Sequence, residues 1–140
     1  MKKLILFSIA CLLSTFVIAQ SKVNSLNSKS SAKQSIYNAI SIGDVKVLKQ
    51  YMSENVTIEI KGIEKVYAKN QATQVLQSFF DENKPNNFEL KHGGRAAKMG
   101  SKFNIGMLRT NQGAYRVTYL MKDDATQEEI RKIKIVKVVQ

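Results

Sequence analysis

The chain has 140 residues, of which 22 are Lys or Arg and 11 are Asp or Glu, so its formal net charge is +11. This length predicts a single folded domain. The single cysteine excludes a disulfide scaffold, and the single histidine, with no carboxylates clustered beside it, argues against a metal centre. The positive charge favours anionic partners, unless it serves solubility alone.

Residues 1–19, MKKLILFSIACLLSTFVIA, combine two lysines, an apolar run and a small residue at Ala19. This pattern is typical of a secretory signal peptide, and it predicts cleavage after Ala19 and export to the periplasm or beyond. A retained anchor and lipidation at Cys11 are the alternatives. Residues 20–30 are rich in Ser, Asn and Lys and predict a flexible leader. The folded domain should then span residues 31–140.

Helical spacing of apolar residues predicts a first helix that starts at Ser31 and ends at Gly43, because glycine tolerates the left-handed conformation of a helix C-terminus. Asp44 should cap a second helix over residues 45–52. A third amphipathic helix is expected over residues 71–82, with Asn70 as a possible cap. The core stripe of that helix should be Ala72, Val75, Leu76, Phe79 and Phe80.

Alternation of apolar and polar residues predicts strands over residues 56–60, 66–67, 88–92, 103–108, 115–121 and 133–138. Turns are expected at residues 53–55 and 111–113, and Gly93 and Gly94 should end the 88–92 strand. Phe103 and Met107 are expected to face the helices. Leu108, Leu120, Val136 and Val138 are expected on the outer face of the sheet.

Three helices interleaved with an early hairpin and followed by four strands predict an α+β fold, in which the helices pack within a curved antiparallel sheet. Five segments occur in order along residues 43–136: GDVKVLKQYMSENVTIEIKG, VYAKNQATQVLQSFFDENKP, FELKHGG, FNIGMLRTNQGAYRVTYLMK and IRKIKIV. Together they resemble the nuclear-transport-factor-2-like superfamily of cone-shaped domains. More narrowly, they resemble a domain-of-unknown-function family of small secreted bacterial proteins. The resemblance implies the fold and the signal peptide, but no reaction.

A pocket inside the cone would suit a small apolar or amphipathic ligand. Its expected lining is Tyr37, His92, Arg95, Phe103, Met107, Tyr115 and Tyr119. His92 alternates onto the same side as Phe88 and Leu90, so it could act as a base or a donor there. The alternatives are a strand-end histidine that is already hydrogen-bonded, and tyrosines that belong to the core.

The first functional hypothesis is therefore a non-catalytic binding domain without metal, cofactor or nucleic acid. One alternative is a small-molecule lyase or isomerase that uses His92, although Glu59 and Glu89 alternate onto the polar side and leave no inward acid. Another is electrostatic docking to an anionic envelope component through Arg131, Lys132 and Lys134. The outer-face aliphatic residues suggest a homodimer, unless they are scattered surface residues.

Overall fold

The computed structural model describes residues 23–96, 100–123 and 127–139. The predicted signal peptide, its cleavage point after Ala19 and the alternative lipidation at Cys11 lie outside the described residues. The chain divides into two units, Met1–Ser31 and Ala32–Gln140, and every described strand belongs to the second. The first helix begins at Val23, so the predicted start at Ser31 is wrong. The flexibility of residues 20–30 stays a prediction.

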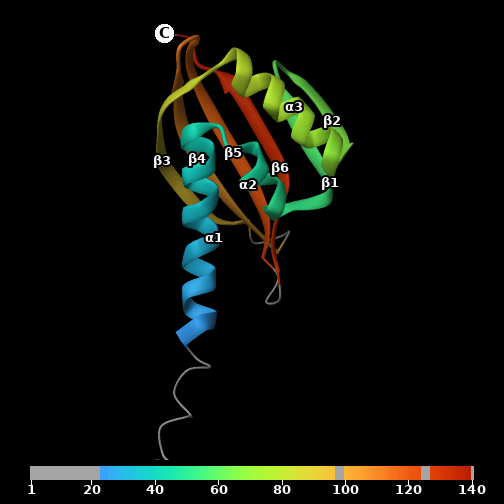
Figure 1. The fold of residues 1–140 in the computed structure, drawn as a ribbon, viewed down its shortest axis with the longest axis vertical. Helices are drawn as coiled ribbons and strands as arrows, with labels where there is room; N and C mark the ends of the chain where they lie inside the picture. Colours follow the sequence, from blue (N-terminus) through green and yellow to red (C-terminus); the bar gives the residue numbers. More distant parts are fainter. Residues whose placement is uncertain (1–22, 97–99, 124–126, 140) are drawn as a thin grey trace, which may run out of the picture. The chain divides into compact units, whose positions relative to one another are not determined.

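Helices lie against one face of a six-stranded sheet whose strand order is β2-β1-β6-β5-β4-β3 (Figure 1). This arrangement confirms the predicted α+β class. Only the β1–β6 pair is parallel among the neighbouring strands of the described chain, so the sheet is not wholly antiparallel. The elements in chain order are α1 (Val23–Ile42), α2 (Val45–Tyr51), β1 (Met52–Ile60), β2 (Ile63–Ala68), α3 (Lys69–Glu82), β3 (Pro85–Ala96), β4 (Ser101–Thr110), β5 (Gly113–Asp123) and β6 (Glu128–Lys137).

The junction between the first two helices forms as the sequence predicts. Gly43 has φ +73°, which a residue with a side chain adopts only at a cost, and it ends α1 after Ile42. The Asp44 carboxylate accepts a 3.1 Å hydrogen bond from the Val47 amide and caps α2. A Cβ added to Gly43 would lie 3.2 Å from Phe80, so this junction also lets α3 approach closely.

The predicted turn at residues 53–55 is wrong, because β1 starts directly after α2. The strand register against β6 shifts between Met52 and Thr57, so the extra residues are absorbed by an irregularity in the sheet. Ser53 is buried, and its hydroxyl lies 2.6 Å from the Asn55 carbonyl and 3.1 Å from the Ile130 carbonyl. A polar segment whose sequence is typical of a turn thus lies inside a strand, where Ser53 forms hydrogen bonds.

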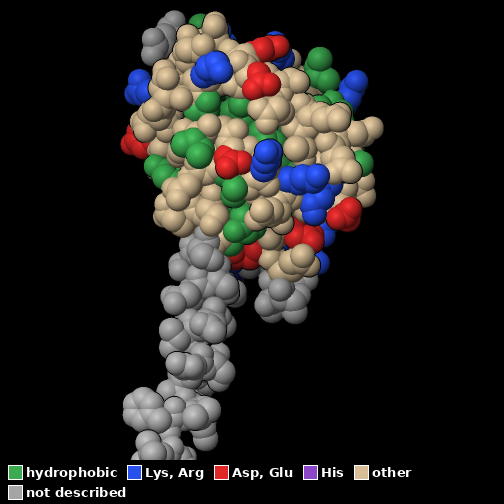
Figure 2. All heavy atoms as spheres, viewed as in Figure 1, with side chains coloured by type: hydrophobic (Ala, Val, Ile, Leu, Met, Phe, Trp, Pro, Cys, Tyr) green, Lys and Arg blue, Asp and Glu red, His purple; other side chains and the backbone are tan. Residues whose placement is uncertain are grey.

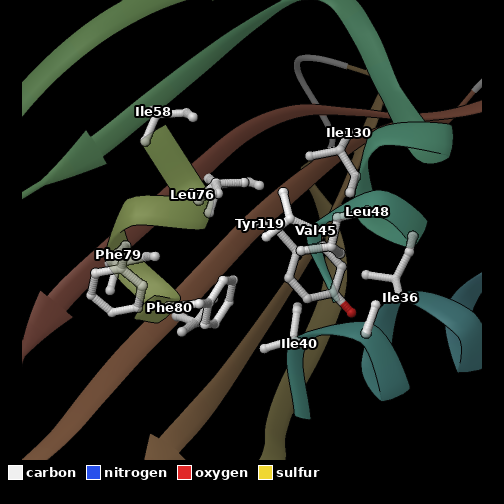
Figure 3. Packing of buried hydrophobic residues seen from close by; sticks show 14 of the residues in the cluster. Ile36, Ile40, Val45, Leu48, Ile58, Leu76, Phe79, Phe80, Tyr119 and Ile130 are labelled. Atoms are coloured by element: carbon white, nitrogen blue, oxygen red, sulfur yellow. The ribbon is translucent and has the colours of Figure 1, made fainter. Parts of the chain in front are cut away.

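The core lies between the helices and the inner face of the sheet (Figure 3). The third helix begins at Lys69 rather than at Gln71, and its N-cap is Ala68 rather than Asn70. It nevertheless buries the predicted stripe, of which only Val75 is partly exposed. Each fully buried aliphatic side chain, such as Leu76 or Ile58, contributes about 1.5–3 kcal/mol by leaving water.

The predicted orientation of β4 is wrong. Leu108 is fully buried and packs in the core, whereas Phe103, Ile105 and Met107 lie half-buried on the outer face of the sheet, which is the face turned away from the helices. Gly106 explains the choice: a Cβ on it would lie 2.4 Å from the Phe88 ring, so the glycine makes room for this buried ring on the inner face. Both sides of β4 carry apolar residues, and packing against Phe88 determines that the side with Gly106 and Leu108 faces the helices.

The β3 strand contains the irregularity that decides where His92 points. The register shifts between Leu90, which pairs with Gly106, and His92, which pairs with Ile105. Directly opposed residues share a face, so the shift moves His92 to the outer side with Ile105. Gly93 and Gly94 do not end the strand, which continues to Ala96.

None of the described helices has the length and apolar character that a membrane span requires.

Candidate functional site

The described residues between the helices and the sheet are closely packed around a small space. The space left there is about 10 Å³ and is bordered by side chains such as Leu48, Leu76, Phe80 and Ile133. A cavity of this size is at the lower limit for one water molecule, so it is too small for a small-molecule ligand. This small space gives no support to the expectation of an apolar ligand inside the cone, which stays a prediction.

Two of the three expected pocket tyrosines serve the packing of the fold. The Tyr37 hydroxyl donates a 2.8 Å hydrogen bond to the Phe88 carbonyl and joins α1 to β3. Tyr119 is 1% exposed, and its hydroxyl has no hydrogen-bond partner among the described residues. Burial raises the pKa of Tyr119 to about 12, so the phenol is neutral at physiological pH. Figure 3 shows Tyr119 among the core side chains Ile36, Ile40 and Leu48.

His92 and Phe103 meet on the outer face instead of in a pocket. The His92 side chain is exposed, and its ring centroid lies 5.7 Å from that of Phe103. The helix-covered side of the molecule shows no histidine in its space-filling view (Figure 2). Arg95 is exposed further along β3, opposite Lys102. The structure therefore separates His92 and Phe103 from Tyr37, Tyr115 and Tyr119, which lie on the helix side of the sheet.

Four half-buried apolar side chains lie together on the outer face, along β4 and the neighbouring β5. They form what we call the outer strip: Phe103, Ile105, Met107 and Leu120. Phe103 and Leu120 are direct partners in the β4–β5 pairing. The rim of the strip carries both signs of charge, with Arg109 and Arg116 exposed beside it and Glu89 opposite Met107. Of the four aliphatic residues predicted for this face, Leu108 is in the core instead. Leu120 is half-buried on the face, Val136 is 40% exposed opposite Arg116, and Val138 is half-buried just after the end of β6.

The cations expected to face an anionic surface are paired within the fold. Lys134 lies 2.9 Å from Glu59, Lys132 lies 2.6 Å from Glu64, and Arg131 lies 3.4 Å from Glu129. The hydrogen bond from Lys134 holds the pKa of Glu59 below its usual value. The parallel β1–β6 register brings Glu59 beside Lys134, so the sequence order alone does not indicate this pairing.

A groove of about 440 Å³ lies at the end of the sheet where α3 ends, and sequence reasoning missed all of its lining except Tyr115. The Tyr115 hydroxyl donates a 2.6 Å hydrogen bond to Asn83 Oδ1. Burial, and to a smaller degree the negative charge of Glu82, raises the pKa of Tyr115. The groove combines residues from the end of α3, two hairpin turns and the strands β1, β5 and β6, so no local pattern points to it. No cluster of three or more potential metal ligands occurs in the described residues.

A six-stranded curved sheet with helices packed on one face is the architecture of the nuclear-transport-factor-2-like, or cystatin-like, α+β domains. Two solved structures with little sequence similarity show the same fold. One is a domain of unknown function with a cystatin-like fold from Nostoc punctiforme, with 10% identity, coverage of 84% of this chain and 79% of that chain, and a TM-score of 0.61. The other is a protein named Rd1NTF2_04 with long sheet, with 11% identity, coverage of 76% and 98%, and a TM-score of 0.61.

The chain belongs to the DUF4783 family, a domain of unknown function whose family model matches residues 33–136. A DUF4783 protein from Bacteroides ovatus is 31% identical, with coverage of 76% of this chain and 94% of that chain and a TM-score of 0.71. No curated protein matches the chain. The family and the fold are thereby shown, and the resemblance read from the sequence is confirmed.

Proposed function

We propose that this chain is an exported, non-catalytic interaction domain that binds a second copy of itself through the outer face of its sheet. The observation that carries the proposal is the outer strip, in which four adjacent apolar side chains lie half-buried on a face that no described helix covers. A contiguous apolar patch of this kind is typical of an interaction surface. The filled interior supports surface binding over ligand capture inside the fold.

The rim of the outer strip favours a second copy as the occupant. In a twofold-symmetric pair, the same surface is used by both subunits, so it must complement itself. Arg116 lies beside Met107 on one flank and Glu89 lies beside Met107 on the other. A twofold rotation can therefore bring the arginine of one copy toward the glutamate of the other while the two apolar strips meet. There it would share this carboxylate with Lys91, which lies 2.6 Å from Glu89 in the same chain.

Sedimentation equilibrium of the processed chain over a range of concentrations tests this proposal. We expect the wild type to dimerise, and the double variant Ile105→Lys, Leu120→Lys to be monomeric with an unchanged circular dichroism spectrum. Ile42→Lys is the matched control, because Ile42 is 72% exposed at the end of α1 and does not belong to the sheet. A wild type that stays monomeric at the highest concentration, or a double variant that still dimerises, contradicts the proposal.

Export is supported by the signal pattern of residues 1–19. Mass spectrometry of the protein recovered from the producing cells should find Gln20 at the mature N-terminus. A chain that retains Met1 contradicts export by this route.

The two alternative functions have no comparable support. A lyase or isomerase that uses His92 needs this side chain in a pocket, and it is exposed on the outer face. Electrostatic docking through Lys132 and Lys134 competes with their pairing to Glu64 and Glu59. Added salt should therefore have little influence on any binding of anionic vesicles at this face.

A further inference from the structure

The groove at the end of the sheet has a preorganised wall. It lies at the upper end of Figure 1, where α3, the β1–β2 turn and the C-terminal part of β6 come together. Asn83 is 4% exposed, and its side-chain amide donates a 2.9 Å hydrogen bond to the Phe79 carbonyl while its oxygen accepts from Tyr115. The Tyr115 ring packs edge-on against Phe79 with 5.2 Å between centroids. This wall is therefore rigid without any ligand.

The polar atoms of this wall are already satisfied, so it offers mainly apolar surface to an occupant. Ile60, the Tyr115 ring and Ile135 line the groove, and because Tyr115 and Ile135 are only 7% and 2% exposed, Ile60 presents the most apolar surface of the three. Ile60 is partly exposed although it belongs to the alternating inner face of β1. A volume of about 440 Å³ falls in the range of small-molecule sites. The groove can therefore receive the apolar body of a small molecule.

The charged residues of the groove favour an anion. Lys61 and Lys137 both line it and are exposed, and neither forms an ion pair with any described residue. The Lys137 ammonium lies 5.9 Å from the centre of the Tyr115 ring, which holds it over the apolar wall. Glu82 contributes one carboxylate against these two cations. The remaining lining side chain, Gln112, is neutral and can donate a hydrogen bond.

The backbone at Lys61 is unusual. Lys61 has φ +54° and the following Gly62 has φ +77°, so both residues of this two-residue hairpin turn are left-handed. Turns of this kind favour Asn or Gly in the first position, because the left-handed backbone conformation costs most other residues free energy. A lysine is thus held at the rim of the groove in a conformation that costs free energy, which is typical of functional positions.

We propose that this groove binds a small organic anion with an apolar body, such as an aliphatic carboxylate. Its carboxylate end would bind to Lys61 and Lys137, and its hydrocarbon part would pack on Tyr115, Ile60 and Ile135. The groove is built from residues that lie outside the outer strip. Binding here is therefore independent of self-association, and either proposal can fail alone.

Titration of the processed chain with decanoate, followed by calorimetry and by amide chemical shifts, tests this inference. We expect saturable binding, with shift changes concentrated at Gln112 and Tyr115. Lys61→Gln and Lys137→Gln should each weaken decanoate binding about fivefold, the equivalent of about 1 kcal/mol for one exposed charge pair. Lys61→Arg and Lys137→Arg should restore most of the affinity. Lys46→Gln, which removes an exposed lysine on α2 outside the groove, should leave it unchanged.

Two further probes separate the contributions of charge and apolar surface. Decanol should bind more weakly than decanoate, and inorganic phosphate should bind more weakly still. Equal binding of decanol and decanoate would overturn the role of the lysines, and equal binding of phosphate would overturn the role of the apolar wall. Absence of decanoate binding, or an equal loss of affinity in Lys46→Gln, would overturn the site itself.

Discussion

The hydroxyl of Tyr115 donates a 2.6 Å hydrogen bond to the side-chain oxygen of Asn83, 32 positions earlier in the chain. Both side chains are buried. The bond connects the residue that ends α3 to the first part of β5, and so fixes one end of the helix against the sheet. It also holds the wall of the groove in place.

Removal of this bond should destabilise the fold. Tyr115→Phe leaves the Asn83 oxygen buried without its donor, and an unsatisfied buried acceptor costs about 1–3 kcal/mol. Urea denaturation at neutral pH should show this loss in the free energy of unfolding. A change below about 0.5 kcal/mol, the scale of an ordinary surface substitution, would show that water satisfies Asn83 equally well.

Tyr119→Phe should change the free energy of unfolding in the opposite direction and stabilise the fold. The Tyr119 hydroxyl is buried without a partner among the described residues, so the folded state carries its desolvation cost without a hydrogen bond in return. The substitution removes this hydroxyl and leaves the ring unchanged, so it should raise the free energy of unfolding by up to about 1 kcal/mol. The same urea experiment measures it, with Tyr115→Phe as the matched comparison. A clear loss of stability would indicate a bound water at this hydroxyl.

Gly106→Ala tests the packing that orients β4. The added methyl group would meet the Phe88 ring at 2.4 Å and the Glu89 carbonyl at 3.0 Å. Overpacking of this kind costs about 1–3 kcal/mol. In the double variant Phe88→Leu, Gly106→Ala the smaller leucine side chain relieves the contact with the added methyl group. The double variant should therefore lose less stability than the sum of the losses in the two single variants. Simple additivity in thermal denaturation would argue that Phe88 does not determine the orientation of β4.

Acid should weaken the pairing of β1 with β6 through Glu59. Its pKa is lowered in the folded state, mainly by the hydrogen bond from Lys134. A carboxyl group with a lowered folded pKa stabilises the fold above its unfolded pKa, and this contribution is lost as the pH falls through the folded pKa. Glu59→Gln should therefore be less stable than the wild type near neutrality and should lose less stability below about pH 4, where unfolded Glu side chains protonate.

Unfolding curves at a series of pH values measure this difference in slope. Glu54→Gln is the control, since Glu54 is an exposed carboxylate 3.4 Å from Lys69 and lies outside the β1–β6 pairing. Parallel pH profiles for the wild type and Glu59→Gln would contradict the prediction.

The sequence by itself determined the features that depend on neighbours along the chain. Gly43 and Asp44 place the α1–α2 junction because one residue tolerates positive φ and the other accepts a hydrogen bond from the next turn. The apolar stripe of α3 and the alternation of Tyr115, Val117, Tyr119 and Met121 identify buried faces, because most of the residues between them are polar. These local patterns were sufficient for the fold class and for the family resemblance.

Only the tertiary structure decided the features that depend on distant segments. The two faces of β4 are both apolar, so alternation cannot say which one meets the helices, and the Phe88 ring over Gly106 decides it. One shift of register in β3 moves His92 from the inner to the outer side. The groove forms because turns far apart in the sequence meet at one end of the sheet. Pairing energy between strands and close packing of side chains act across the chain, and a pattern read along one segment does not contain them.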